Sequence, residues 1–353
     1  MPERSVSTRL ADRTTLRLGG PAAGLVRAAS ADEIVAAVDA LDAAGTPLLV
    51  LGGGSNLVVA DEGFAGTVVA LGAPDHDAVT VADDADRDGV EVTVAAGVWW
   101  DDLVARAGAE GWVGVEALSG IPGTVGATPI QNVGAYGQDV AQRVRRVRVW
   151  DRRLRGVRTF AGDECAFGYR TSRFKRDRYD AVGGRHVVLD VTFGLARGDL
   201  SAPVAYAELA RTLGVEVGER APLADVREAV LGLRRGKGMV LDADDHDTWS
   251  AGSFFTNPVI DPGLVPDGAP AYPQPDGSVK TSAAWLIDRA GFAKGYPGDG
   301  PVTLSTKHTL ALTNRGGAST ADLLALAREI RDGVADRFGI VLENEPVTVG
   351  CAL

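Results

Sequence analysis

The chain has 353 residues, of which 45% are hydrophobic and 24% charged, and its formal net charge is −11 at pH 7; this predicts a globular protein of two or three domains. The negative charge argues against a nucleic-acid-binding protein, which would present a basic face, and no apolar run approaches the roughly 20 residues that span a bilayer. The N-terminus shows no signal-peptide core, and Cys165 and Cys351 offer neither a disulfide framework nor a metal-ligand spacing, so we expect a cytoplasmic protein that binds neither nucleic acid nor membrane.

The first two hundred residues alternate short apolar runs with helical segments. Their patterns predict strands at 22–28, 47–50, 89–95, 144–150 and 186–193, and helices at 31–44 and 99–110. Ser30 is the expected N-cap of the first helix. This is a mixed α+β pattern rather than a regular βαβ array.

The character of the sequence changes beyond residue 197 or so. The spacing of apolar residues predicts helices at 203–213, 222–235, 281–288 and 318–337, and a short strand at 340–342. A polar, acidic loop is expected at 241–247. We therefore place a domain boundary near residues 196–202.

A glycine turn, Gly52-Gly53-Gly54-Ser55-Asn56, lies between two β-type runs. It differs from the dinucleotide-binding fingerprint of Rossmann folds, because Leu57 replaces the third glycine and a strand rather than a helix follows. Its backbone N–H groups and the Ser55 and Asn56 side chains can still bind phosphate oxygens.

The acidic segment Asp75–Asp88 is expected to be a solvated loop. Asp84, Asp86, Asp88 and Gly89 resemble the start of a calcium loop, but Ala95 stands where the bidentate glutamate should be. The sequence therefore argues against a calcium site in this segment.

Residues 116–137, EALSGIPGTVGATPIQNVGAYG, combine five glycines and two prolines with small hydroxyl and amide residues. Such density of glycine is typical of backbone that approaches a ligand closely, and successive N–H groups can bind anions. An irregular surface loop is the alternative reading of the composition. Together with the glycine turn, the segment suggests a dinucleotide bound from two sides.

Seven motifs in register carry a resemblance to a known family. They are LGGGSN (51–56), SGIPGTVGATPIQNVGAYG (119–137), FGYRTSRFK (167–175), RRGKG (234–238), AGSFFTNP (251–258), AAWLID (283–288) and LENEP (342–346). With them the chain resembles the UDP-N-acetylenolpyruvoylglucosamine reductases, flavoenzymes that complete UDP-N-acetylmuramate for the bacterial wall. The resemblance implies a vanillyl-alcohol-oxidase/PCMH-type FAD-binding domain at 17–196, with subdomains of about 17–72 and 73–196, followed by an α+β substrate-binding domain at 203–353.

The resemblance also assigns site residues, residue by residue. It implies non-covalent FAD, held by Gly52, Gly53, Gly54, Ser55, Asn56, Ser119, Ile121, Pro122, Gly123, Thr124, Gly126, Ala127, Gln131, Asn132 and Gly134. It implies Arg170, Ser253 and Glu345 as catalytic residues, and Tyr169, Tyr206, Arg234, Lys237, Asn257 and His308 as substrate contacts. Tyr206 suggests the subgroup with a mobile tyrosine loop. The implied co-substrate is NADPH, and we expect a monomer.

Two departures from the family pattern stand near the site. Thr128 precedes Pro129 where the family commonly has alanine, which adds a hydroxyl near the flavin. Pro346 follows Glu345 where valine is usual, which removes one backbone N–H and fixes φ beside a catalytic position.

The residues suit reduction of an enolpyruvyl ether. Hydride delivered to the β-carbon leaves negative charge that spreads onto the carboxylate, which Arg170 can bind through both oxygens. Glu345 is useful beside that charge if it is protonated, and Ser253 matches the proton donor to the α-carbon. Two other functions remain open: an oxidase with the same FAD domain, which would not need AGSFF or the terminal glutamate, and a nucleotide-sugar-binding protein without turnover, which would be expected to lack the serine.

Overall fold

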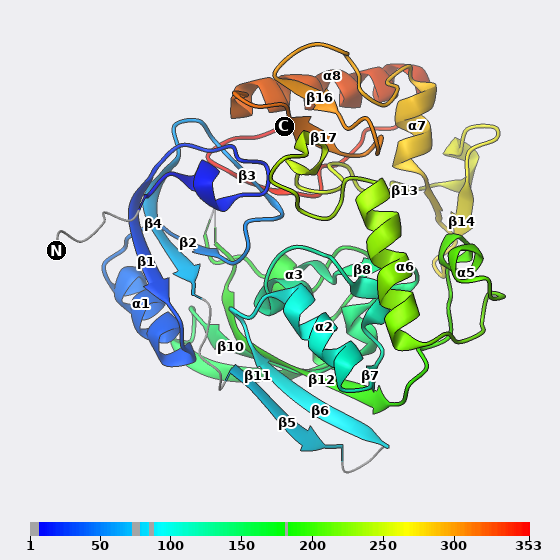
Figure 1. Ribbon diagram of the computed structural model, residues 1–353. Helices are drawn as coiled ribbons and strands as arrows, with labels where there is room; N and C mark the ends of the chain where they lie inside the picture. Colours follow the sequence, from blue (N-terminus) through cyan, green and yellow to red (C-terminus); the bar gives the residue numbers. More distant parts are fainter. Residues whose placement is uncertain (1–6, 73–77, 85–87, 181–182) are drawn as a thin grey trace. The chain divides into compact units, whose positions relative to one another are not determined.

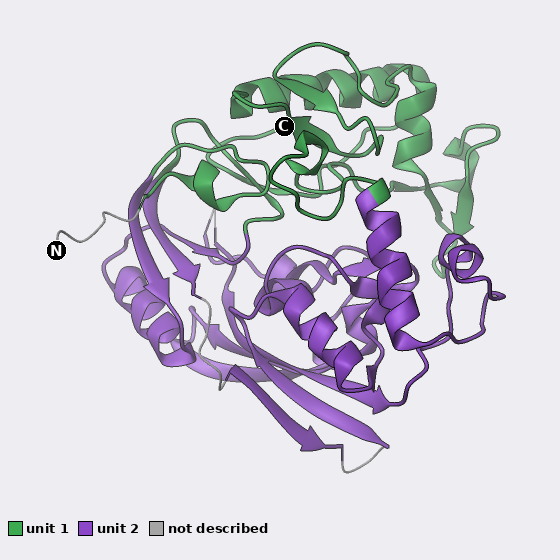
Figure 2. Ribbon diagram, viewed as in Figure 1, with its two compact units in different colours: residues 1–21, 54–64, 236–353 green, residues 22–53, 65–235 purple. Residues whose placement is uncertain are grey.

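The computed structural model describes residues 7–72, 78–84, 88–180 and 183–353. The chain forms two compact units, shown in Figure 2. Unit 1 contains the described part of residues 1–21 together with 54–64 and 236–353, and unit 2 contains 22–53 and 65–235.

A three-stranded sheet lies at the start of unit 2. It has the order β1 (Ala22–Ala28), β4 (Phe64–Leu71), β2 (Leu48–Leu51), and β2 runs parallel to β4. Helix α1 (Ala31–Ala43) begins at the predicted N-cap, Ser30, whose hydroxyl accepts a hydrogen bond from Glu33 N at 3.2 Å. Ile34 and Val38 of α1 are buried in one core with Leu48 and Val69 of this sheet.

A larger antiparallel sheet forms the rest of the framework of unit 2 (Figure 1). Its order is β11 (Gly156–Ala161), β10 (Val144–Asp151), β12 (His186–Arg197), β6 (Gly89–Ala95) and β5 (Val79–Asp83), and β7 (Trp112–Val113) pairs with β12. Helix α2 (Trp100–Ala109) buries Trp100 and Leu103 in the same core as Val92 and Phe193 of the sheet.

Strand β5 corrects the expectation that Asp75–Asp88 is wholly a loop. Its backbone pairs with β6 from Val79↔Val94 to Asp83↔Val90, while the side chains of residues 80–83 remain exposed. An edge strand can leave these side chains exposed because only its backbone needs a partner. Residues 73–77 and 85–87, including Asp86 of the calcium-loop pattern, lie outside the described residues.

Short elements, together with the longer helix α6, shape the glycine-rich segment and the parts of the chain that follow it. They are η3 (Glu116–Leu118), η4 (Val125–Ala127), α3 (Thr128–Gln131), β8 (Gly134–Ala135), β9 (Gln138–Asp139), η5 (Val140–Gln142), η6 (Asp163–Cys165), α4 (Arg173–Arg176), α5 (Ala207–Leu213) and α6 (Leu223–Gly236). Helix α5 begins four residues later than predicted, because the Val204 N–H donates to Glu219 O at 2.8 Å and so takes this residue out of the helix.

Unit 1 combines small sheets with two helices. The strands are β3 (Leu57–Val59) parallel to β18 (Val347–Val349), the set β13 (Val259–Ile260), β15 (Val279–Thr281), β14 (Ala271–Pro273), and the pair β16 (Val302–Leu304) with β17 (Leu312–Asn314). The helical elements are η1 (Leu10–Arg13), η7 (His246–Thr248), η8 (Pro262–Leu264), α7 (Ala283–Arg289) and α8 (Thr320–Phe338). Helix α8 packs against β16, β17 and α7 (Figure 1), and its buried side, with Leu323 and Ile330, joins the core of Phe254 and Leu286.

The strand predicted at 340–342 is wrong. Ile340 and Leu342 are buried and Val341 is exposed, so the alternation serves packing against the core, yet this segment joins no sheet among the described residues. The strand at this end of the chain is β18. Over the described ranges no helix is both long and apolar enough to cross a bilayer, and both cysteines are free thiols.

Candidate functional site

Within unit 2, the first two residues of the glycine turn lie against the glycine-rich segment. A Cβ on Gly53 would approach Gly123 Cα to 2.6 Å, and a Cβ on Gly52 would overlap the Thr124 hydroxyl. This contact requires glycine at both positions of the turn. Two backbones that are far apart in sequence are therefore adjacent, as a ligand bound by both would need.

Thr124 supplies a further sign of a ligand at this place. Its Oγ1 is buried and has no hydrogen-bond partner among the described residues. A buried polar group without a partner costs on the order of 1–3 kcal/mol, and a phosphate oxygen would accept a hydrogen bond from this hydroxyl. The residues present therefore fit a phosphate-bearing cofactor.

The remaining turn residues belong to unit 1. Gly54, Ser55 and Asn56 lead into β3, and Val347 N donates to Asn56 O at 3.0 Å. The other predicted cofactor residues, from Ser119 to Gly134, all lie in unit 2 on the segment from η3 to β8.

Three residues with left-handed backbone occur in or near this segment. Asn132, Tyr136 and Arg170 have φ values of 45°, 49° and 53°. Such conformations cost of order 1–3 kcal/mol each in residues other than glycine and collect at functional sites. Their surroundings must hold them in place.

Hydrogen bonds join the glycine-rich segment to the FGYR segment in unit 2. The Arg170 guanidinium donates from Nη2 to Gly134 O at 3.0 Å, and Ser172 Oγ donates to Ile130 O at 2.8 Å. Asn132 Nδ2 donates to Gly168 O at 2.9 Å, while Asn132 Oδ1 accepts from Ala141 N at 3.2 Å. The predicted catalytic Arg170 is thus fixed to the segment predicted to hold the cofactor.

Tyr169 and Lys175 flank Arg170. The Arg170 guanidinium lies over the Tyr169 ring at 5.5 Å from its centroid. Lys175 Nζ donates to Arg170 O at 3.1 Å, so a cation holds the strained backbone of this residue.

Tyr206 and Arg234, two predicted substrate contacts, also lie in unit 2. Tyr206 precedes α5, is 47% exposed, and its ring meets that of Tyr136 edge-on at 5.6 Å. Arg234 near the end of α6 is buried, and burial lowers its pKa to about 10, so it remains a cation at neutral pH. A buried cation of this kind suits an anionic ligand.

In unit 1, the segment that carries Ser253 lies between two others. Phe254 N donates to Leu310 O at 2.7 Å, and Glu345 N donates to Phe254 O at 2.8 Å. The structure therefore brings together the segments of Ser253 and Glu345, and the turn of His308, whose N–H donates to Ser305 Oγ at 3.2 Å, reaches the same segment through Leu310.

The backbone around Pro346 is well fixed despite its missing N–H. Glu345 N donates to Phe254 O at 2.8 Å, and Val347 N donates to Asn56 O at 3.0 Å. The proline therefore lies between two bonded amides. Asn257 Oδ1 accepts from Ala283 N at 3.0 Å and so holds the first residue of α7, while Lys237 follows α6 at the start of the last stretch of unit 1.

Sequence reasoning missed several carboxylates that hold these segments. Asp247, predicted as part of an acidic loop, is buried in η7 and accepts from Thr306 N and from Arg315 Nη1, each at 2.9 Å. Burial alone would raise the pKa of Asp247, but the hydrogen bonds from Thr306 and Arg315 outweigh it and hold the pKa below its ordinary value. Only the folded chain shows these partners, since they lie about 60 residues away in sequence.

Asp101 has a similar role in unit 2. Its carboxylate accepts both hydrogen bonds of the Arg227 guanidinium, at 2.7 and 2.9 Å, and one from Gly120 N at 2.6 Å. It therefore ties α6, which carries Arg234, to the glycine-rich segment.

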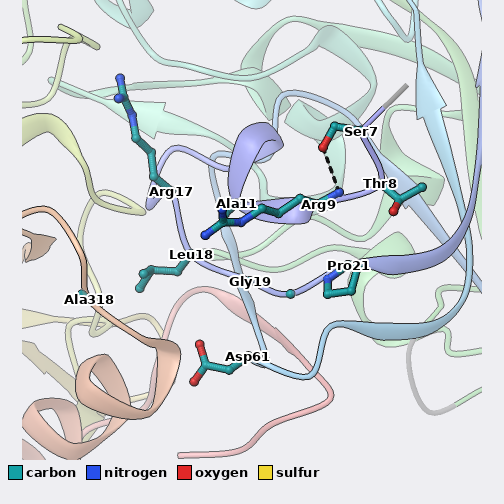
Figure 3. Close-up of a pocket in the computed structure, with 11 residues that line it drawn as sticks. Ser7, Thr8, Arg9, Ala11, Arg17, Leu18, Gly19, Pro21, Asp61 and Ala318 are labelled. Carbon is teal, nitrogen blue, oxygen red and sulfur yellow. Dashed lines mark hydrogen bonds between the residues drawn. The ribbon is translucent and has the colours of Figure 1, made fainter. Parts of the chain in front are cut away.

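A hollow of about 730 Å³ in unit 1 contains none of the predicted site residues. Figure 3 shows its lining, including Arg9, Arg17 and Asp61. The Asp61 carboxylate accepts from Thr320 N at 2.7 Å and Ala321 N at 3.0 Å, so it already satisfies the first amides of α8. Among the described residues no group of acidic, histidine or cysteine side chains could hold a metal ion.

Comparison with known proteins identifies the family of the chain. Residues 22–155 match a family of FAD-binding domains, and residues 244–349 match the C-terminal domain of UDP-N-acetylenolpyruvoylglucosamine reductase. Reductases of that name from Thermobifida fusca and Cutibacterium acnes are 60% and 57% identical, over 98% of this chain and 97% and 90% of their own lengths. The crystal structure of the reductase from Thermus caldophilus superposes with a TM-score of 0.64 at 26% identity, over 98% of both chains.

These matches bear out the resemblance and the fold class expected from the motifs. The fold is α+β, with a PCMH-type FAD-binding domain followed by the C-terminal domain of the reductases. The chain belongs to the UDP-N-acetylenolpyruvoylglucosamine reductase family.

Proposed function

We propose that the protein reduces UDP-N-acetyl-enolpyruvoyl-glucosamine to UDP-N-acetylmuramate, with NADPH as the reductant and FAD as the bound cofactor, for the synthesis of peptidoglycan precursors. The observation that carries the proposal is the 60% identity to a reductase of this name along nearly the whole of both chains. All seven motifs are present in the sequence, both those that carry the predicted cofactor residues and those that carry Arg170, Ser253 and Glu345.

The cofactor residues would be those of the glycine turn and the glycine-rich segment. Thr124 Oγ1, which lacks a protein partner among the described residues, would donate to a phosphate oxygen. When bound, FAD takes up a hydride from NADPH and supplies it to the substrate. We expect non-covalent binding, because neither segment contains the histidine or cysteine that would form a covalent link.

Arg170 would bind the carboxylate of the enolpyruvyl group. Its guanidinium is held against Gly134 O, so its orientation is set before substrate arrives. As hydride reaches the β-carbon, negative charge spreads onto the carboxylate oxygens, and the ion pair with Arg170 strengthens. Arg170 would therefore stabilise the transition state more than the ground state.

Ser253 would donate the proton to the α-carbon, and Glu345 would act at the same carboxylate end. Both residues lie on hydrogen-bonded segments of unit 1, joined through Phe254. A serine hydroxyl is a weak acid, so its contribution depends on orientation. The fixed backbone on both sides of Phe254 supports such an orientation.

The substrate's nucleotide part would be held by cations and a tyrosine. Arg234 and Lys237 would neutralise the diphosphate, and Asn257, His308 and Tyr169 would contact the remaining groups. Tyr206 would cover the ligand as a lid, as in relatives with a tyrosine loop, with its hydroxyl at a phosphate. We propose 17–196 as the FAD-binding domain and 203–353 as the substrate-binding domain of a cytoplasmic monomer.

Turnover tests the proposal. Purified protein should consume NADPH only when the enolpyruvyl nucleotide is present, and the product should be heavier than the substrate by two hydrogens in mass spectrometry. Oxidation of NADPH at an unchanged rate without the nucleotide, with hydrogen peroxide as the product, would instead identify an oxidase.

A further inference from the structure

Glu116 begins the glycine-rich segment and is 4% exposed. Its Oε2 accepts from Gly114 N at 2.6 Å, and its Oε1 accepts from Gln138 Nε2 at 3.0 Å and Ala202 N at 2.7 Å. All three partners are donors, so both carboxyl oxygens serve as acceptors. A buried carboxylate with this many partners is a costly group to retain without a role.

One of these contacts closes the glycine-rich segment. Gln138 returns a second hydrogen bond, since its Oε1 accepts from Ala117 N at 2.9 Å. Glu116 and Gln138 therefore link the two ends of the segment whose interior, 119–134, contains the predicted FAD residues. A fixed closure lowers the entropy that the segment must lose when it binds a ligand.

The contact with Ala202 links the same carboxylate to a second structure of unit 2. The chain near Ala202 pairs with residues 218–222, as Ser201 N donates to Ala221 O and Val204 N to Glu219 O, both at 2.8 Å. From there it enters Tyr206 and α5. Ala117, next to Glu116, shares a buried cluster with Val204, Leu209 and Val230.

We propose that Glu116 is a positioning residue that closes the FAD-binding segment through Gln138 and aligns the Tyr206 segment with it through Ala202. This rests on the proposed function for the ligands that the two segments bind. Glu116 touches neither ligand, and it acts by fixing the backbones that do.

The hydrogen-bond count identifies the variants that separate the two contacts. Glu116→Leu removes both acceptor oxygens at similar volume, so that Gly114 N, Gln138 Nε2 and Ala202 N all lose this acceptor. Gln138→Leu breaks the closure but leaves Glu116 to accept from Ala202 N. Val38→Ala on α1, a fully buried position in a different core cluster from the residues around Glu116, is the matched control, because it destabilises unit 2 away from both contacts.

The test measures FAD dissociation by flavin fluorescence, KM for the UDP-sugar and the thermal midpoint. Glu116→Leu should weaken FAD binding about tenfold to a hundredfold, the range for one buried donor (here Gln138 Nε2) left without an acceptor, and should raise KM for the UDP-sugar. Gln138→Leu should weaken FAD binding with an unchanged KM for the UDP-sugar, and Val38→Ala should lower the midpoint with little change in either.

A rescue variant adds a readout that general destabilisation would not produce. In the double variant Glu116→Gln/Gln138→Glu, the new amide at position 116 can donate to the new carboxylate at position 138, which also accepts from Ala117 N. The Ala202 amide then faces an N–H₂ group instead of a carboxylate oxygen. FAD binding should recover while KM for the UDP-sugar stays high.

Two results would overturn the role of Glu116: FAD affinity and KM in Glu116→Leu that equal those of the wild type, or changes that Val38→Ala reproduces at the same loss of thermal midpoint. Wild-type protein that binds no FAD would instead refute the proposed function, so the two failures are distinguishable.

Discussion

Replacing Ser253 by alanine should slow the reduction of the substrate and leave the reduction of the flavin by NADPH near normal. Only the first of these steps needs a proton at the α-carbon. Loss of a positioned general acid lowers a rate by about 10²–10⁴, which corresponds to about 2.7–5.4 kcal/mol of transition-state stabilisation.

The structure indicates that this loss would be chemical rather than a loss of fold. The Ser253 hydroxyl is not hydrogen-bonded to any other described residue, and the adjacent Phe254 is held at both its N–H and its C=O, at 2.7 and 2.8 Å. The substitution therefore removes one side-chain hydroxyl while the backbone stays in place. The free energy of unfolding should change by no more than a surface substitution would change it, about 0.5 kcal/mol.

Stopped-flow absorbance of the flavin under anaerobic conditions measures the two steps separately. Ser253→Cys, with a more acidic group of similar reach, should keep more activity than the alanine variant. Ser250→Ala is the matched control, because Ser250 Oγ accepts from Gly252 N at 3.2 Å and so supports the same turn without a chemical role. Re-oxidation of the alanine variant by substrate at the wild-type rate would remove Ser253 from the chemistry.

Three further predictions concern Tyr206, Asp247 and the bound flavin. Tyr206→Phe should raise KM for the UDP-sugar more than KM for NADPH in steady-state assays, whereas equal effects on both would indicate a structural tyrosine. Asp247→Asn should destabilise the protein by about 1–3 kcal/mol at neutral pH, since it leaves buried donors unpaired. The folded-state pKa of Asp247 is depressed, so its contribution to stability is present above the ordinary aspartate pKa of about 4 and is lost as the pH falls through the folded-state value. The thermal midpoints of variant and wild type should therefore converge in acid. A difference between the two midpoints that stays constant with pH would contradict this linkage. Acid precipitation should release the flavin into the supernatant, and flavin that stays with the pellet would show a covalent bond.

The sequence predicted the elements whose signals are local. Helix α1 has its N-cap at Ser30 and strand β1 covers 22–28, both as expected. Helix α8 begins two residues after its predicted start, and its apolar face, with Leu323 and Ile330, is buried as the 3.6-residue period requires.

Errors occurred where long-range pairing decides the structure. Residues 79–83 form a strand because β6 offers a backbone to pair with, and residues 340–342 do not, because among the described residues no strand lies beside them. A short run of alternating residues is compatible with both outcomes.

The supporting residues of the site could not be predicted for the same reason. Glu116 meets Ala202 across 86 positions, and Asp101 meets Arg227 across 126. A carboxylate in a glycine-rich or helical context gives no sign of such a partner in the sequence. The motif residues were found through family resemblance, whereas the contacts that hold them required the fold.

In the proposed reaction, one bound flavin passes a hydride from NADPH to the enolpyruvyl nucleotide. The most direct test is anaerobic and has two steps, in which NADPH is added first and, after its removal, the nucleotide is added. We expect NADPH to bleach the yellow colour of the protein, and one equivalent of the nucleotide to restore it while forming one equivalent of UDP-N-acetylmuramate. If the reduced protein stays colourless with the nucleotide and is re-oxidised only by oxygen, this result would contradict hydride transfer from the flavin to the nucleotide.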